Sequence, residues 1–334
     1  PAARRRPEAQ CGAGDADGLL AVEPEAGRRV IVGAPDTYSH VKAVLAKALD
    51  AHQFPASFRP ILEIALGQRG RVLSGDPAPR WSTLVLSSCV ASGGNIPTGA
   101  CVAAAVECFI AGADLIDDIQ DGDPSPVLDV VGLPQGLNAA AALLVLAHAI
   151  LDGLDEYGVP VHRVPTFTRT LSHGALRSAG GQHLDLLAEG QNEVGTADAY
   201  AIVRSKAGTL AGMATRLGAL VGTDDAQLLS LYEAFGTHMG VIAQINNDLL
   251  DAQSIGYKTD VARQKSTLPL VYNRSSHREV QPHLPHQRCE CSVDTETRAF
   301  VEVVLTAELH QARAVLDELA GQGQDVAPLV ELLG

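Results

Sequence analysis

Aromatic residues are scarce in this 334-residue chain, where Phe, Trp and Tyr together make up 4% of the sequence and Trp occurs once. Ala, Leu, Val and Gly predominate instead, and hydrophobic residues reach 46%. Because strands are enriched in aromatic and β-branched residues, this composition argues against an aromatic-rich sandwich and favours helices packed closely through small side chains.

Positive charge is also in short supply, since 25 Lys and Arg face 39 Asp and Glu and the formal net charge is −14. A chain this acidic is a poor candidate for non-specific binding to nucleic acid or to anionic membranes. No apolar run reaches the roughly 18 uncharged residues that would span a bilayer, and no apolar signal-peptide core follows the basic residues 1–7. We therefore expect a cytoplasmic protein with no membrane span.

Cysteines are few and do not form the pattern of a disulfide framework. Of the six, Cys89, Cys101 and Cys108 lie in apolar helical stretches and are expected to be small core residues. A His/Cys group at His283, His286, Cys289 and Cys291 could bind zinc, but Cys-x-Cys spacing in a polar stretch favours a disordered loop.

Helical periodicity dominates the chain and strand signals are few. Residues 1–36 are rich in Ala, Gly, Pro, Arg and Glu and predict a disordered arm, followed by a single all-α domain over 37–334 with a polar loop at 274–293. The expected helices cover residues 38–52, 56–67, 80–92, 97–121, 136–154, 162–189, 196–221, 225–253 and 294–321. Such long helices predict a single large helical bundle around a central apolar cavity.

Two acidic clusters about 130 residues apart stand out within these helices: Asp117-Asp118-Ile119-Gln120-Asp121 and Asn247-Asp248-Leu249-Leu250-Asp251. The first and last residues of each cluster are four apart, which places them about 40° apart on one helical face. Carboxylates in an apolar helix are costly unless a cation binds them, and Mg²⁺ often binds one or two carboxylates together with substrate phosphates. If the clusters face each other, they predict a cage for a diphosphate bridged by metal ions.

The two clusters resemble the paired Asp-rich motifs of the trans-isoprenyl diphosphate synthases, or polyprenyl synthetases, within the class I terpenoid synthase superfamily. Five further elements resemble that family in order along the chain, and the matches span roughly residues 80 to 272. They are Gly132-Leu133-Pro134-Gln135 with Asn138, Gly181–Asp185, Lys206-Ala207-Gly208, Gln244-Ile245 and Lys265–Leu270. The second cluster departs from the commonest pattern, because Asn247 replaces an Asp.

The resemblance implies roles for these residues in binding several Mg²⁺ ions and a diphosphate. Asp117, Asp118, Asp121, Asn247, Asp248 and Asp251 would be metal ligands, and Lys206 and Lys265 would clamp the diphosphate, with Arg204 and Lys258 as weaker candidates. Gln182 and Gln244 would contact the substrate, or would only form hydrogen bonds in the core. The resemblance alone implies a homodimer.

Small residues precede the first cluster where the family places a bulky floor that limits chain length. Gly112 and Ala113 therefore predict an allylic chain of C15 to C20 or longer, with close helix packing as the alternative. The Arg pair that follows the first cluster in chain-elongating members is missing here, and Arg80 is what remains of an earlier basic element, because Arg69 and Arg71 lie in poor register. The site for isopentenyl diphosphate therefore looks impaired.

Three functions follow from these features. The favoured one is Mg²⁺-dependent ionisation of an allylic diphosphate with prenyl transfer to isopentenyl diphosphate or another acceptor. The second is a class I terpene synthase, a carbon–oxygen lyase that needs no isopentenyl diphosphate. The third is a non-catalytic partner that regulates an active synthase.

Overall fold

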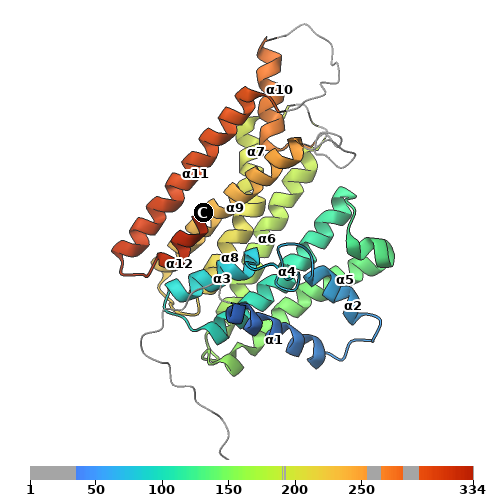
Figure 1. Cartoon of the computed structure of the whole chain (residues 1–334), viewed down its shortest axis with the longest axis vertical. Coiled ribbons are helices and arrows are strands. Elements are labelled where there is room, and N and C mark those ends of the chain that lie inside the picture. Colours follow the sequence, from blue (N-terminus) through green and yellow to red (C-terminus); the bar gives the residue numbers. More distant parts are fainter. Residues whose placement is uncertain (1–34, 190, 192, 254–264, 281–292, 334) are drawn as a thin grey trace, which may run out of the picture. The chain divides into compact units, whose positions relative to one another are not determined.

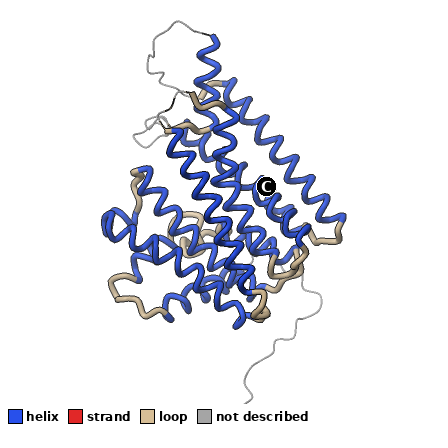
Figure 2. The backbone as a smooth tube through the Cα atoms, turned by 180° about the vertical axis from the view of Figure 1, so that it is seen from behind, coloured by secondary structure: helices blue, strands red, loops and turns tan. Residues whose placement is uncertain are grey.

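The computed structural model describes residues 35–189, 191, 193–253, 265–280 and 293–333. All of them belong to one compact unit, Ile31–Gly334. Every regular element in this part of the chain is a helix, which confirms the predicted all-α class (Figures 1 and 2). The elements are α1 (Pro35–Ala51), α2 (Arg59–Leu66), α3 (Arg80–Ala91), α4 (Ile96–Asp121), α5 (Pro126–Asp152), η1 (Gly153–Tyr157), α6 (Val164–Ala188), α7 (Thr196–Val203), η2 (Arg204–Gly208), α8 (Thr209–Ala219), α9 (Ala226–Gln253), α10 (Leu268–Val280), α11 (Thr295–Gly321), α12 (Ala327–Val330) and η3 (Glu331–Leu333).

Helix α4, which carries the first acidic cluster, is the most deeply buried long helix. The Asn95 side chain caps its N-terminus by accepting a hydrogen bond from the Thr98 amide at 2.9 Å. Gly122 ends the helix in the left-handed conformation at φ 64°. The run from Thr98 to Gly112 is entirely buried, and α4 packs against α1, α3 and α5.

The second acidic cluster lies on α9, which packs against η2, α8 and α11. Two glycines on α9 allow close contact: a Cβ at Gly240 would lie 2.5 Å from the Ala207 carbonyl oxygen, and one at Gly236 would lie 2.5 Å from that of Ala211. Small residues thus bring the backbones together, as the composition predicts, and they draw η2 and α8 against the helix that carries the second cluster.

Several predicted boundaries need correction. Helix α5 begins ten residues earlier than expected and bends at Gly132 (φ 71°). The predicted helix over 196–221 is divided by the π-helical turn η2. Residues 274–280 belong to α10 and not to a loop. Residues 281–292 of the expected loop, the possible zinc group at 283–291, Lys258 and the arm before Pro35 lie outside the described residues.

Two described helices are long and apolar enough to cross a membrane by length and composition alone, Ile96–Asp121 and Pro126–Tyr157. This revises the expectation that no segment would pass such a test. The most apolar window of the first is 83% buried, as in a core helix of a bundle. The corresponding window of the second is 44% buried, so part of the apolar surface of α5 faces outward.

Candidate active site

The two acidic clusters meet at one cavity, which we call the acidic cavity. Its volume is about 230 Å³. Asp117 and Asp121 reach it from α4, while Asn247, Asp248 and Asp251 reach it from α9. The remaining lining residues are Asp123, Asp185, Ala199, Ile202, Val203, Lys206, Gln244, Lys265, Ser266 and Thr267. Residues of both acidic clusters, on two helices far apart in the sequence, therefore face one cavity.

Both predicted lysines enter the acidic cavity and pair with aspartates. Lys206 Nζ donates to Asp117 Oδ1 at 2.9 Å and to Asp185 Oδ2 at 3.0 Å. Lys265 Nζ pairs with Asp121 Oδ2. Lys206 lies in the π-helical turn η2, a rare geometry that often occurs at functional sites. A cation is therefore already in place beside each of the two α4 carboxylates.

Burial and the neighbouring opposite charges shift the pKa values of Asp117 and Lys206. Burial raises the pKa of Asp117 above its ordinary value, although the Lys206 ammonium acts in the opposite direction. Burial alone would lower the pKa of Lys206, but the adjacent carboxylates of Asp117 and Asp185 outweigh it and raise that pKa. Lys206 is therefore a permanent cation, suited to binding an anionic oxygen.

Asp118 occupies a different environment from its neighbours in the first cluster. It does not line the acidic cavity, because it lies about 100° around α4 from Asp117. Its carboxylate forms a hydrogen bond with Ser125, and burial raises its pKa to about 6, with Asp114 and Asp123 adding like charge. The predicted role of Asp118 as a direct metal ligand is not supported by this position.

The two predicted glutamines are placed differently. Gln244 Nε2 donates to Asp248 Oδ1 at 2.7 Å, and Gln244 lines the acidic cavity. Gln182 Nε2 donates to Gln120 Oε1 at 3.0 Å, and Gln182 Oε1 is buried without a partner. Gln182 belongs to α6 and is not among the residues that line the acidic cavity.

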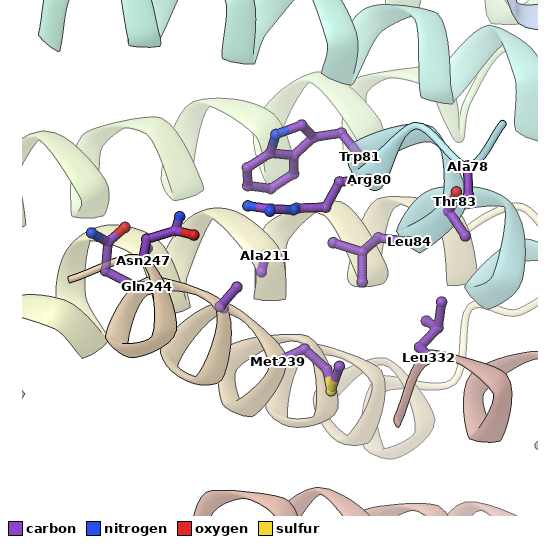
Figure 3. Close-up of a pocket in the computed structure, with 13 residues that line it drawn as sticks. Ala78, Arg80, Trp81, Thr83, Leu84, Ala211, Met239, Gln244, Asn247 and Leu332 are labelled. Atoms are coloured by element: carbon purple, nitrogen blue, oxygen red, sulfur yellow. The ribbon is translucent and has the colours of Figure 1, made fainter. Parts of the chain in front are cut away.

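A second cavity, which we call the apolar cavity, adjoins the first. Its volume is about 380 Å³, and Gln244 and Asn247 line both cavities. The other lining residues are Ala78, Arg80, Trp81, Thr83, Leu84, Ala207, Ala211, Met239, Gly240, Ala243 and Leu332. Figure 3 shows the Arg80 guanidinium pointing towards Gln244 and Asn247, while Ala78, Thr83 and Leu332 lie at the opposite end. The cavity thus has a polar end at Gln244 and Asn247 and is mainly apolar elsewhere.

Comparison with known proteins assigns the family. A profile described as polyprenyl synthetase matches residues 80–299. The chain belongs to the polyprenyl synthetase family. A geranylgeranyl diphosphate synthase from Mycobacterium tuberculosis is 32% identical over 216 residues, which cover 61% of this chain and 60% of that protein. A farnesyl diphosphate synthase from Geobacillus stearothermophilus is 25% identical over 296 residues, covering 81% and 95% of the two chains.

The chain is also similar to a prenyltransferase with another named function and to solved structures of synthases. A tryptophan prenyltransferase from Bacillus subtilis subsp. natto is 26% identical over 148 residues, which cover 44% of this chain and 43% of that protein. Among solved structures, a decaprenyl diphosphate synthase from Rhodobacter capsulatus aligns with a TM-score of 0.71 at 18% identity, covering 89% of this chain and 93% of the other. That structural likeness confirms that this chain has the all-α fold.

The acidic cavity fits the metal ions that the polyprenyl synthetase family implies. Its donors are carboxylate and amide oxygens, the hard ligands that Mg²⁺ prefers. Asp121 Oδ1 is buried in it without a hydrogen-bond partner. Within the described part of the chain, no three acidic, His or Cys side chains form a ready metal-binding group.

Gly112 and Ala113, the residues predicted to leave room at the floor of the chain pocket, do not line either cavity. Gly112 faces α5, where an added Cβ would lie 2.8 Å from the Ala140 carbonyl oxygen and 3.2 Å from the Leu143 Cβ. Close helix packing, the alternative considered from the sequence, explains this glycine. Ala113 is half-buried and packs against the core, and it is absent from the lining of both cavities.

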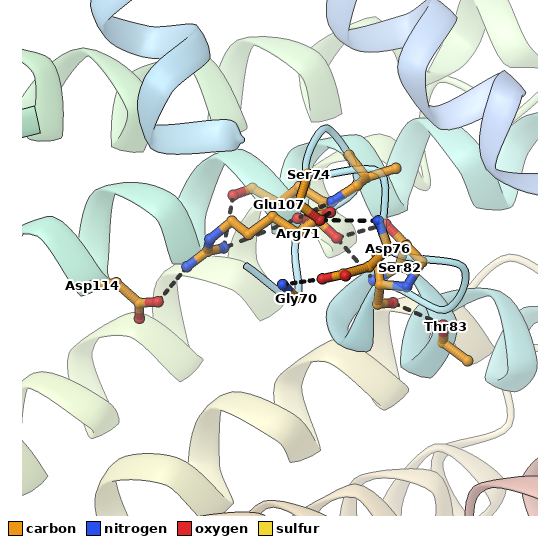
Figure 4. A network of polar contacts seen from close by, with 10 residues as sticks. Gly70, Arg71, Ser74, Asp76, Ser82, Thr83, Glu107 and Asp114 are labelled. Carbon is orange, nitrogen blue, oxygen red and sulfur yellow. Dashed lines mark hydrogen bonds and ion pairs between the residues drawn. The ribbon is translucent and has the colours of Figure 1, made fainter. Parts of the chain in front are cut away.

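The structure places the basic residues upstream of the first acidic cluster, Arg80 and Arg71, in different environments. Arg80 lines the polar end of the apolar cavity. Arg71 is 3% exposed and is committed to carboxylates: it pairs with Asp114, and its Nη1 lies 4.0 Å from Glu107 Oε2 (Figure 4). Glu107 also accepts hydrogen bonds from the amide and hydroxyl of Ser82, at 3.1 and 2.6 Å. The network joins the loop before α3 to α4.

Sequence reasoning assigned no role to four polar residues that line the acidic cavity, Asp123, Asp185, Ser266 and Thr267. Asp185 belongs to the Gly-Gln-x-x-Asp element, but its pairing with Lys206 requires the contact between α6 and η2. Thr267 follows Lys265 by two residues, and its buried hydroxyl has no partner. Position within matched elements was the signal that could have identified Asp185 and Thr267.

Proposed function

We propose that this chain ionises an allylic isoprenyl diphosphate with the help of Mg²⁺ and transfers the prenyl group to an acceptor. The observation that carries the proposal is the acidic cavity, where two carboxylate clusters and two lysines meet beside the polar end of an apolar cavity. This arrangement matches the two halves of such a substrate, a strongly anionic group and a hydrocarbon chain.

The residues of the acidic cavity divide into two groups in this proposal. Asp117 and Asp121 on one side, with Asn247, Asp248 and Asp251 on the other, would hold the metal ions. When bound, Mg²⁺ supplies positive charge that stabilises the departing diphosphate. Lys206 and Lys265 supply further positive charge where negative charge develops, and the apolar cavity keeps water away from the allylic cation.

Two kinds of acceptor fit the proposal, one that bears a diphosphate and one that does not. Relatives named as synthases of farnesyl and geranylgeranyl diphosphate favour prenyl transfer to a diphosphate-bearing acceptor. However, Arg80 is the one cationic residue among those that line the apolar cavity, and Arg71 is paired with Asp114. A second diphosphate needs more compensating charge than Arg80 provides. The tryptophan prenyltransferase among the relatives supports an acceptor of another kind.

A terpene synthase remains the second candidate, because the same apolar cavity would also suit a cation that cyclises or loses a proton without any acceptor. The chain length of C15 to C20 or longer stays a prediction, since the position of Gly112 gives it no support.

We also propose that two copies of the chain associate through α5 and α6. Each helix exposes large apolar side chains at helical spacing: Val130, Leu133, Leu137 and Val145 on α5, and Leu176, Leu184 and Leu187 on α6. Sedimentation at twice the chain mass of 34.9 kDa is expected, and Leu137→Glu should shift the protein towards monomer. Monomeric wild-type protein at micromolar concentration would refute this association.

The decisive experiment incubates purified protein with Mg²⁺ and farnesyl or geranylgeranyl diphosphate, with and without isopentenyl diphosphate, and identifies products by mass spectrometry. A longer prenyl diphosphate formed only with isopentenyl diphosphate identifies a chain-elongating synthase. A hydrocarbon or alcohol formed without it identifies a terpene synthase. Release of no diphosphate from any allylic substrate would refute both and favour a non-catalytic partner.

A further inference from the structure

We infer that Glu107 on α4 is a positioning residue, which caps the first turn of the neighbouring helix α3 and thereby holds Arg80 and Trp81 in the wall of the apolar cavity. Glu107 itself lines neither cavity. The consequence of this capping for substrate binding rests on the proposed function, whereas the capping and its effect on the two side chains do not.

The N-terminus of α3 has no capping side chain of its own. The residue before the helix is Pro79, whose side chain cannot accept a hydrogen bond. Glu107 takes that role from another helix, because its Oε1 accepts hydrogen bonds from the Ser82 amide at 3.1 Å and from the Ser82 hydroxyl at 2.6 Å. Ser82 is the third residue of α3, a position whose amide an N-cap side chain ordinarily binds. A carboxylate at this end also interacts favourably with the helix dipole.

The deep burial of Glu107 needs an explanation beyond stability. Its exposed fraction is 0%, and the guanidinium of Arg71 beside it is buried as well. Burial raises the pKa of Glu107, while Arg71 and the hydrogen bonds from Ser82 act in the opposite direction. Apolar residues of similar volume often stabilise a fold as well as a buried ion pair does, so the pair is weak evidence for a contribution to stability. What the carboxylate adds is direction, because its hydrogen bonds fix the first turn of α3 against α4.

The capped turn carries two residues of the apolar cavity. Arg80 and Trp81 are the first two residues of α3, and both line that cavity. The Arg80 guanidinium points towards Gln244 and Asn247, which also line the acidic cavity (Figure 3). Fraying of the turn would redirect both side chains, because the direction of a helical side chain follows its backbone. Glu107 therefore acts on the apolar cavity through the first turn of α3.

Arg71 extends the same network along α4. Its guanidinium pairs with Glu107 and with Asp114, about two helical turns further along that helix. The loop before α3 joins the network too, since the Val72 amide donates to Glu107 Oε2 at 3.5 Å (Figure 4). Arg71 would keep Asp114 as a partner if Glu107 lost its charge. A neutral variant of Glu107 therefore leaves no unpaired buried cation and is expected to fold.

Hydrogen exchange tests the capping without any substrate. Glu107→Gln should speed the exchange of the amides in 80–83 by about fivefold or more, as loss of a helix cap predicts. The matched control is Glu308→Gln, because Glu308 is also a buried, hydrogen-bonded carboxylate but lies on α11. Unchanged exchange at 80–83 in Glu107→Gln, or an equal increase there in Glu308→Gln, would overturn the inference.

A milder variant keeps this test decisive if Glu107→Gln does not fold. Ser82→Ala removes the hydroxyl that donates to Glu107 at 2.6 Å and leaves the amide in place. It should speed exchange at 80–83 by a smaller factor than Glu107→Gln. Wild-type exchange at 80–83 in Ser82→Ala, with Glu107→Gln unfolded, would count against the capping.

Trp81 reports on the same turn by its fluorescence. It is the single Trp in the sequence, and it is half-buried and packs against the core. In Glu107→Gln its emission should shift to longer wavelength and acrylamide should quench it more strongly, because the indole leaves its packed position. Glu308→Gln should keep the wild-type spectrum. A wild-type spectrum in Glu107→Gln would contradict the positioning of Trp81.

A double-mutant cycle tests whether Glu107 acts on a ligand through Arg80. The probe is farnesyl thiodiphosphate, in which sulfur replaces the bridging oxygen, and its binding with Mg²⁺ is measured by calorimetry. Arg80→Gln should weaken binding by about tenfold, and Glu107→Gln nearly as much, because each withdraws the guanidinium from the polar end of the apolar cavity. The double variant should lose no more than Arg80→Gln alone. Additive losses, or no loss in Glu107→Gln, would overturn the action through Arg80.

The outcomes separate this inference from the proposed function. Wild-type protein that binds the analogue but never releases diphosphate from farnesyl diphosphate would refute prenyl transfer and leave the role of Glu107 standing. Normal turnover in the wild type, with unchanged exchange at 80–83 in Glu107→Gln, would do the reverse. If the wild type does not bind the analogue, the proposed function fails, and exchange and Trp81 fluorescence decide the capping.

Discussion

The two adjoining cavities differ in almost every property although they share two residues. The acidic cavity is lined by six aspartates and two lysines, while the apolar cavity has one charged lining residue, Arg80. Gln244 and Asn247 stand at their boundary. The contrast shows that this fold gathers charged side chains in one cavity and apolar side chains in the other. The uncharged amides of Gln244 and Asn247 lie between them.

The largest expected effect tests which side chains of the first cluster belong to the acidic cavity. Asp117→Asn should reduce diphosphate release from an allylic substrate by about 10³-fold, because it removes a carboxylate that faces the cavity and Lys206. Asp118→Asn should cost only about tenfold, since that side chain faces Ser125. Both rates are measured with saturating Mg²⁺ and substrate. Equal losses would show that Asp118 reaches the metal during turnover.

Removing a lysine should have the next largest effect. Lys265→Gln is expected to lower the same rate by roughly 10²-fold, because it withdraws positive charge beside Asp121 where the leaving group would gain negative charge. Lys47→Gln is the control: that lysine is 63% exposed and pairs with Glu156 at the surface. A near-normal rate in Lys265→Gln would count against a role in diphosphate binding.

Inorganic diphosphate offers a test of the acidic cavity alone. Together with Mg²⁺ it should raise the melting temperature. The free energy of unfolding should rise by about 2.7 kcal/mol when diphosphate is at 100 times its Kd. EDTA should abolish the shift. Ala243→Phe, which alters only the apolar cavity, should retain the shift in full, and Asp117→Asn should lose most of it. A shift that survives EDTA would contradict the metal-bridged arrangement.

The smallest expected effect concerns a buried polar group outside both cavities. Glu308 on α11 accepts hydrogen bonds from Tyr200 and His238, and although burial opposes it, these bonds lower the pKa of Glu308 below its ordinary value. The ionised form therefore stabilises the fold above the ordinary pKa, and this contribution disappears as the pH falls through the lowered value. Loss of this contribution should lower the stability of the fold without affecting ligand binding in one cavity more than in the other.

Glu308→Gln should lower the free energy of unfolding by about 1.5–3 kcal/mol at pH 7, and the difference from wild type should shrink towards pH 4. Urea titrations at several pH values measure it, with the exposed Glu302→Gln as control. Ligand binding should stay normal in both cavities. A difference that grows on acidification would contradict the assigned contacts of Glu308.

Much of the fold was predictable because periodicity and small-residue content are local properties of the chain. The ends of α3, α4, α6, α9 and α11 agree with the predicted helices to within two residues. The division of 196–221 at η2 was not predictable, since Arg204–Gly208 remains helical and only its hydrogen-bond register changes. No helix was predicted over 268–280, and α10 was missed because its composition is polar.

The sequence by itself determined the family and the helical class. It also placed Asp117 and Asp121 on one helical face, and Asn247 and Asp251 on another, because residues four apart in a helix share a face. Only the tertiary structure decided what each face meets. It brought Asp185 to Lys206, placed the two acidic clusters around one cavity and packed Gly112 against α5. The reason is physical: a helix sets the direction of its side chains locally, whereas its neighbours depend on packing between segments far apart in the chain.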